Sequence, residues 1–165
     1  MNSRRFRNKG RASERRDARV LLRTELAAVT RLFDRFETSR SMARKKAIVE
    51  QICLALTVQA QLENEILYPA LKRACNNHAF GPRARQHQAI LKSLIDEVQG
   101  NEPDDDGYEA SVRLMAEQVK HHVARQDAIF PADAARQLDL AALGAQLASR
   151  KRELLAGMSD FGGWD

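Results

Sequence analysis

The chain has 165 residues, enough for one domain with its own hydrophobic core. An aromatic content of 5% and only 4 prolines favour helices over a β-sandwich or barrel, and 2 cysteines are too few for a disulfide scaffold. No apolar run approaches the roughly 18 residues of a membrane span, and we expect neither a transmembrane segment nor a secretory signal. The expected setting is a reducing, cytoplasmic compartment.

The formal net charge of +5 is concentrated at the N-terminus. Residues 1–19 carry eight basic and two acidic side chains, a net charge of +6, whereas residues 20–165 carry 19 basic and 20 acidic side chains, a net charge of −1. The basic side chains of this segment are Arg4, Arg5, Arg7, Lys9, Arg11, Arg15, Arg16 and Arg19. We expect residues 1–16 to form a disordered or extended tail, and clustered arginines to suit nucleic acid or another anionic surface.

Helical periodicity begins near residue 17, where apolar residues recur every three or four positions from Leu22 to Phe36. The sequence predicts four long helices, at 17–39, 41–75, 82–99 and 107–130. Pro69 is expected to kink the second helix, and Pro131 to end the fourth.

Short connections between four long helices predict an all-α, antiparallel, up-down-up-down four-helix bundle over residues 17–135. An amphipathic C-terminal helix is predicted over 136–158, followed by a loose end at 159–165.

Several polar residues occupy positions where the helical period requires apolar ones. They are Gln59 and Glu63 on the second helix, Gln88 on the third with His87 at the edge of its apolar stripe, and His122 and Gln126 on the fourth. Two residues at i and i+4 point to the same place, which is how bundles build metal sites. A simpler interpretation is that Glu63 pairs with His122 while the glutamines complete a hydrogen-bonded layer.

Four segments resemble the hemerythrin HHE family of helical cation-binding domains. They are Leu-Phe-Asp-Arg-Phe-Glu (32–37), Gln-Leu-Glu-Asn-Glu-Ile-Leu-Tyr-Pro-Ala-Leu (61–71), Lys-Ser-Leu-Ile-Asp-Glu (92–97) and Val-Lys-His-His-Val (119–123) followed by Ile-Phe-Pro. The resemblance covers about residues 17–135, and it implies a bundle with a di-iron centre.

The resemblance also implies where the metal ligands would lie, and most of those positions are substituted. The positions at which the family supplies ligands hold Leu26, Gln59, Glu63, Gln88 (or His87, one step away), His122 and Gln126. Counting back from the aromatic-proline pair instead places the last two at His121 and Arg125, whereas the apolar period favours His122. Residual ligand candidates are therefore Glu63, His122, His121 and His87.

Amides and a leucine are poor replacements for the carboxylates and imidazoles that hold iron. We therefore expect a degenerate site without a cofactor, in a non-catalytic scaffold or interaction protein whose protein partner and oligomeric state the sequence does not identify. Two alternatives stay open. One is an altered site that binds metal and handles iron, oxygen or nitric oxide, and the other is an accessory protein whose basic tail binds nucleic acid or an anionic surface.

Overall fold

The computed structural model describes residues 17–75, 80–129 and 138–161. Within these ranges every regular element is a helix, which confirms the all-α prediction for the part of the chain described. None of these helices is long and apolar enough to span a membrane. Outside the described ranges lie the predicted tail at 1–16, the predicted break at Pro131 and the last residues, 162–165.

The first two helices begin at side-chain caps. Helix α2 spans Ala18–Thr38, and the carboxylate of Asp17 accepts a hydrogen bond from the backbone N–H of Arg19 at 2.8 Å. Helix α3 spans Met42–Leu62, and the hydroxyl of Ser41 accepts a hydrogen bond from the N–H of Arg44 at 3.3 Å. Each cap satisfies one N–H group that a helix start leaves without an intrahelical partner, so the starts are specified locally.

The predicted kink at Pro69 takes the form of a π-helical turn. Helix α3 passes into the π-helix η1, Glu63–Leu67, and then into α4, Tyr68–Cys75. The N–H of Tyr68 donates to the carbonyl of Glu63, five residues back. Because a proline ring crowds the preceding turn and donates no hydrogen bond, a wider turn just before Pro69 relieves the clash while the chain stays helical.

Helix α5 spans Phe80–Gln99 and α6 spans Tyr108–Ile129. Helix α5 starts two residues before the predicted position 82, which leaves Pro82 within the first turn, where its missing N–H would have had no intrahelical partner. Gly107, just before α6, has a φ of 84°, a left-handed conformation that favours glycine.

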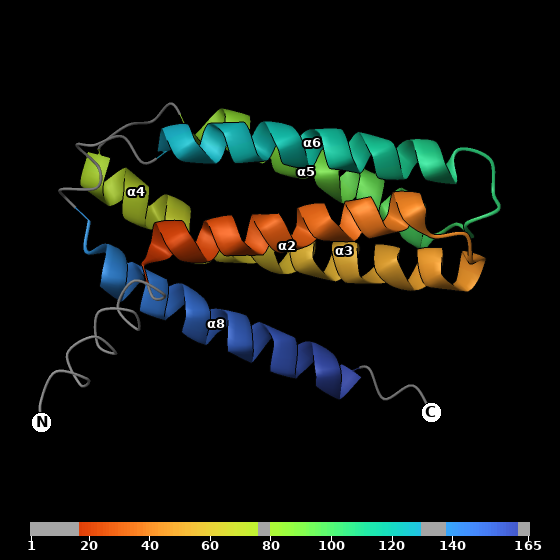
Figure 1. Ribbon diagram of the computed structural model, residues 1–165. Helices are drawn as coiled ribbons and strands as arrows, with labels where there is room; N and C mark the ends of the chain where they lie inside the picture. The colour runs from red at the N-terminus through yellow and green to blue at the C-terminus, as the bar shows by residue number, and fades with distance from the viewer. Residues whose placement is uncertain (1–16, 76–79, 130–137, 162–165) are drawn as a thin grey trace, which may run out of the picture.

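Helices α2, α3, α5 and α6 lie side by side, and each runs back along the one before it (Figure 1). Helix α3 packs beside α2 and α5, and α6 packs beside the same two helices, so α3 and α6 occupy diagonal positions. Two clusters of buried apolar residues fill the interior, one containing Leu26, Leu56 and Val119 and the other containing Leu22 and Leu62. Along α3 the first cluster ends at Leu56 and the second begins at Val58, so the boundary between them lies one turn or less before Gln59.

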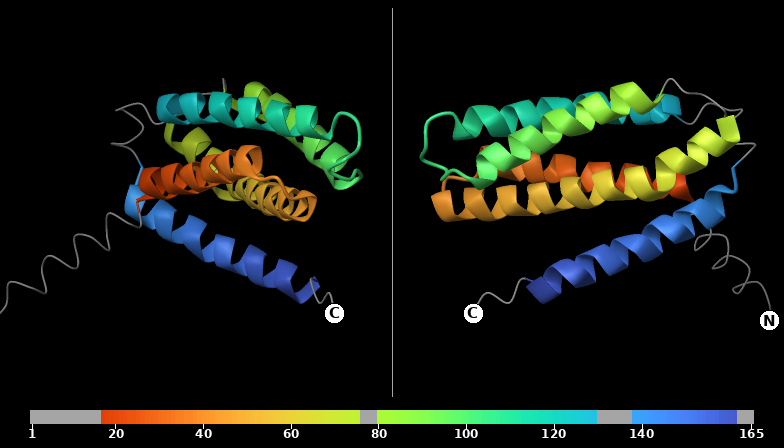
Figure 2. Two further views of the ribbon diagram at one scale, coloured as in Figure 1. Left: turned by 45° about the vertical axis from the view of Figure 1, so that its right-hand side comes forward. Right: turned by 180° about the vertical axis from the view of Figure 1, so that it is seen from behind.

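Helix α8, Leu140–Phe161, crosses the outside of α2 and α3 at an angle (Figures 1 and 2). Leu143 and Leu147 are buried against the second apolar cluster. The helix continues to Phe161, beyond the predicted end at 158, since no glycine or proline stands between Met158 and Phe161 to stop it.

Candidate functional site

A polar layer crosses the interior at the boundary between the two apolar clusters. Its residues are those that the sequence places at ligand positions, and five polar members are at most 8% exposed: Gln59, Glu63, His87, His122 and Gln126. Leu26 of α2 is buried at the same level and closes one side. Four helical segments thus contribute to a single layer.

Glu63 is the centre of this layer because both of its carboxylate oxygens are bonded to protein donors. Its Oε1 accepts from Gln59 Nε2 at 3.3 Å and lies 2.7 Å from His122 Nε2. Its Oε2 accepts from the Tyr68 hydroxyl at 2.8 Å and from Gln88 Nε2 at 3.3 Å. An ionised carboxylate only accepts hydrogen bonds, so these four donors satisfy it without water.

The electrostatics of the layer follow from these bonds. Burial by itself raises the pKa of Glu63, but the hydrogen bond and charge of His122, with the bonds from Tyr68 and Gln59, outweigh burial and bring the pKa below its usual value. Burial and the neighbouring Glu63 carboxylate raise the pKa of the Tyr68 phenol. Glu63 is therefore an ionised acceptor and Tyr68 a neutral donor at neutral pH.

His87 lies inside the bundle and not at the edge where the sequence placed it. Its ring stacks on that of His122, with centroids 5.0 Å apart and planes 5° from parallel. Burial lowers the pKa of His87 to about 4, helped by the charges of His122 and Arg125 and opposed by Glu63 and a hydrogen bond with Gln118. His87 is therefore neutral at pH 7.

The choice between His87 and Gln88 left open by the sequence has a mixed outcome. His87 is 4% exposed, while Gln88 is half-buried and still reaches Glu63 through its amide. Side chains at adjacent positions of a helix point about 100° apart. His87 and Gln88 both reach the layer because the layer lies between their two directions.

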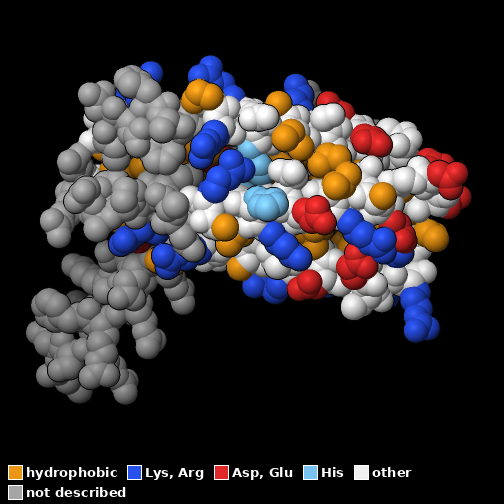
Figure 3. Space-filling model, turned by 90° about the horizontal axis from the view of Figure 1, so that it is seen from above, with side chains coloured by type: hydrophobic (Ala, Val, Ile, Leu, Met, Phe, Trp, Pro, Cys, Tyr) orange, Lys and Arg blue, Asp and Glu red, His pale blue; other side chains and the backbone are white. Residues whose placement is uncertain are grey.

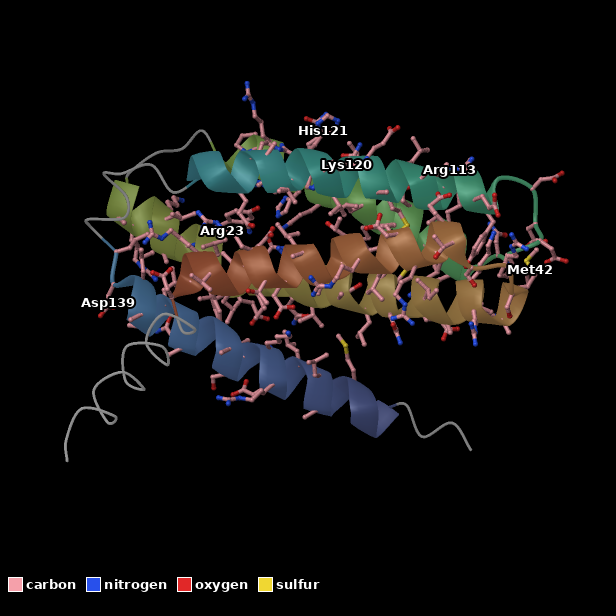
Figure 4. All side chains as sticks on the ribbon, in the orientation of Figure 1. Arg23, Met42, Arg113, Lys120, His121 and Asp139 are labelled. Carbon is pink, nitrogen blue, oxygen red and sulfur yellow. The ribbon has the colours of Figure 1, made fainter. Side chains whose placement is uncertain are left out.

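The alternative register on α6 is not brought into the layer. His121 is exposed and lies on the outer side of α6, next to Lys120 (Figure 4), whereas His122 is buried. Arg125 is half-buried and close enough to act electrostatically on His87 and Tyr68. His121 therefore makes no contribution to the layer.

Gln59 and Gln88 bond to Glu63 as predicted for the layer, but the hydrogen bonding is not complete at Gln126. Gln126 is buried, but its Nε2 makes no hydrogen bond with the described residues, and neither does His87 Nε2. A small cavity of about 20 Å³ lies beside Leu26, Glu63, His87 and His122. That is room for about one water molecule.

Tyr68 is the layer residue that sequence reasoning missed. In a regular α-helix, residues five apart point about 140° away from each other. The π-helical turn instead places residues five apart on one side, which brings the Tyr68 hydroxyl to Glu63. The available signal was Pro69, since a proline inside a helix requires a local distortion.

The donor set does not fit the di-iron centre that the resemblance implies. A two-metal site separates its ions by about 3.5–4 Å and needs bridging carboxylates, whereas the layer holds one carboxylate and a cavity of about 20 Å³. The lone pairs of His87 and His122 lie in nearly parallel planes, so the two rings do not converge on one ion. Among the described residues, no group of three or more His, Cys, Asp or Glu is arranged to hold a metal.

Comparison with protein-family models, with curated proteins and with solved structures gives no match for this chain.

Proposed function

We propose that this chain is a hemerythrin-like four-helix bundle whose metal layer has been replaced by a layer of protein hydrogen bonds. Its role would be that of a non-catalytic scaffold or interaction domain. The observation that carries this proposal is the saturation of Glu63 by donors from Gln59, Tyr68, Gln88 and His122. In a metal site, those carboxylate lone pairs would be directed at the ion.

The substitutions at the other ligand positions support the same proposal. Leu26 presents methyl groups, and Gln59, Gln88 and Gln126 present neutral amides, which are weak ligands for iron. The ion pair and the hydrogen bonds let one buried carboxylate remain in the core without a cation. The layer then acts as a polar contact that joins diagonal helices.

The proposal is tested by metal analysis of the full-length protein purified from cells grown with added iron. We expect far less than one iron per chain and no near-ultraviolet absorption from an oxo-bridged centre. Stoichiometric iron together with that absorption would overturn the proposal in favour of an altered site that handles iron, oxygen or nitric oxide. Repeating the measurement after growth with added zinc and manganese extends the test to other metals.

A further inference from the structure

A pocket lies between helix α8 and the side of the bundle formed by α2 and α3. Its volume is about 210 Å³, and we call it the α8 pocket. Most of its lining is apolar and comes from all three helices: Leu22, Leu54, Ala55, Val58, Leu62 and Leu155. An apolar cavity of about 150 Å³ is enough for benzene, so the α8 pocket has room for a ring that carries a short substituent.

The crossing angle of α8 explains why this space is open. Leu147 is fully buried against the bundle, whereas Lys151 and Leu155, one and two turns later, are only half-buried. The C-terminal end of α8 points away from α3 (Figures 1 and 2). Because the two helices diverge, side chains of α8 fill less of the space beside α3, and a concave site remains.

The concave shape distinguishes the α8 pocket from exposed apolar residues elsewhere. Figure 3 looks onto α6 and shows apolar side chains interspersed with charged and polar ones, which is ordinary for a protein surface. In the α8 pocket, apolar side chains from three helices line a single concave space. An apolar ligand bound there loses most of its contact with water, as in known small-molecule sites.

The charged groups of the pocket are an ion pair at its mouth. Lys151 of α8 donates a hydrogen bond to Oε1 of Glu25 on α2. Their side chains are 31% and 27% exposed, so the pair stands where the pocket reaches solvent. An ammonium has three N–H donors and a carboxylate has two acceptor oxygens, so the pair retains a donor and an acceptor for a ligand.

The remaining polar residues of the lining are two neutral glutamines. Gln51 is exposed, and Gln59 separates the α8 pocket from the small cavity of the polar layer, because it lines both. The only charges among the lining residues are therefore those of Glu25 and Lys151, and they cancel.

This charge balance favours a neutral ligand. A carboxylate would be attracted by Lys151 but repelled by Glu25, and an ammonium would meet the reverse, because the two groups stand together. A hydroxyl avoids both repulsions, since it accepts from the ammonium and donates to the carboxylate while their ion pair stays intact. We propose that the α8 pocket binds a small neutral alcohol or phenol, with its hydroxyl at the ion pair and its apolar body among the apolar side chains.

This inference goes beyond the proposed scaffold role and does not rest on it, since it does not involve the iron content of the protein. The probes are four compounds that share one ring: benzyl alcohol, benzoate, benzylammonium and toluene. Each is titrated into isotope-labelled full-length protein with assigned amide signals, and the chemical shifts report both affinity and location. We expect saturable shifts in α2, α3 and α8, with benzyl alcohol bound at least about threefold more tightly than the other three.

Two variants that fill the pocket test its position. Ala55→Leu fills it from α3 and Leu155→Phe fills it from α8, so the test does not depend on one variant folding. Each adds three carbon atoms, and each should weaken the binding of benzyl alcohol at least about tenfold, because the ring loses its buried site. Ala116→Leu, at a half-buried alanine of α6 outside the lining, is the matched control and should bind like wild type. Circular dichroism checks that the variants are folded.

Two further variants test the ion pair. Glu25→Gln should tighten the binding of benzoate, and Lys151→Gln that of benzylammonium, each at least about threefold, because one repelling charge is removed. Benzoate and benzylammonium affinities that stay unchanged would contradict the role of the pair.

Three other outcomes would overturn the inference. The first is the absence of saturable shifts with all four probes, and the second is unchanged binding of benzyl alcohol in both folded pocket-filling variants. The third is binding of benzoate, benzylammonium or toluene that is at least as tight as that of benzyl alcohol, which would exclude selection for a neutral hydroxyl.

Discussion

The imidazole of His122 and the carboxylate of Glu63 meet at 2.7 Å across the diagonal of the bundle. His122 belongs to α6 and Glu63 to the turn that directly continues α3, and α3 and α6 each pack beside α2 and α5. A buried pair of this kind is costly to form and more costly to break, because removing one partner leaves the other desolvated and unpaired. The pair therefore specifies which faces of α3 and α6 point inward.

The first prediction concerns the energy of this pair. His122→Leu should destabilise the protein by about 3 kcal/mol, since Glu63 would stay buried as a carboxylate without its strongest partner. Glu63→Leu should also destabilise, whereas the double variant should lose less than the sum of the two by about 1–3 kcal/mol. Urea unfolding of the four proteins measures this double-mutant cycle.

His121→Leu is the matched control for this cycle because His121 is the exposed neighbour of His122. Its effect on the free energy of unfolding should stay within about 0.5 kcal/mol. Additive losses in the cycle would show that Glu63 and His122 do not interact as the structure has them.

The second prediction concerns pH. The pKa of His87 is lowered to about 4 in the folded state, against an ordinary value of 6.5 in the unfolded chain. Between these values the unfolded state binds a proton that the folded state does not, so stability should rise with pH across this interval. Across the whole interval between the two pKa values, the free energy of unfolding should change by about 3 kcal/mol. Urea unfolding at several pH values measures the slope.

His87→Gln should remove this slope, and His121→Gln should retain it. The comparison is best made between about pH 5 and pH 7, above the ordinary pKa of glutamate. The lowered pKa of Glu63 contributes stability that is lost only when the pH falls below that range. An identical slope in wild type and His87→Gln would contradict the burial of a neutral His87.

The third prediction tests the origin of the layer. Replacing Leu26, Gln59 and Gln88 by His and Gln126 by Glu would regenerate two His-x-x-x-Glu pairs and two single histidines. This variant should take up about two iron atoms per chain and absorb in the near-ultraviolet when oxidised. Without metal it should melt below wild type, because a second buried carboxylate lacks a partner, and Fe²⁺ should raise its melting temperature.

A three-site variant that keeps Gln88 tests whether His87 or position 88 supplies the iron ligand from α5. If only the three-site variant binds iron, His87 supplies the ligand from α5. If both variants fold and neither binds iron, the assignment of these positions to ligand positions is wrong.

The fourth prediction concerns the attachment of α8. Leu147 is fully buried, so Leu147→Ala should cost about 2–5 kcal/mol in unfolding free energy. Arg150 binds Glu65 at 2.7 Å on the surface, and Arg150→Gln should cost much less, because salt and water screen such pairs. Leu114→Ala, at a residue 49% exposed, is the control for loss of side-chain volume. Equal losses for Leu147→Ala and Leu114→Ala would contradict the packing of α8.

Local periodicity was sufficient to predict the helices and the inward side of α2. Leu22, Leu26 and Phe36 lie on one stripe and are all buried, since 3.6 residues per turn fixes which positions share a face. The same argument placed Gln59, Glu63 and His122 inside the bundle, and all three are buried there. The capping residues Asp17 and Ser41 likewise act within their own turns.

The bonding within the layer depended on the tertiary structure. The rotation of α5 about its own axis decides whether His87 or Gln88 points to the interior. The apolar stripe of α5 defines that rotation only to within about one residue position. The contact between Tyr68 and Glu63 depends on a π-helical turn that changes which residues share a face. The sequence by itself thus determined that Gln59, Glu63 and His122 are buried, because burial on these helices follows a local period. Only packing between helices decided the burial of His87 and the hydrogen-bond partners of the layer, because those contacts join residues far apart in the chain.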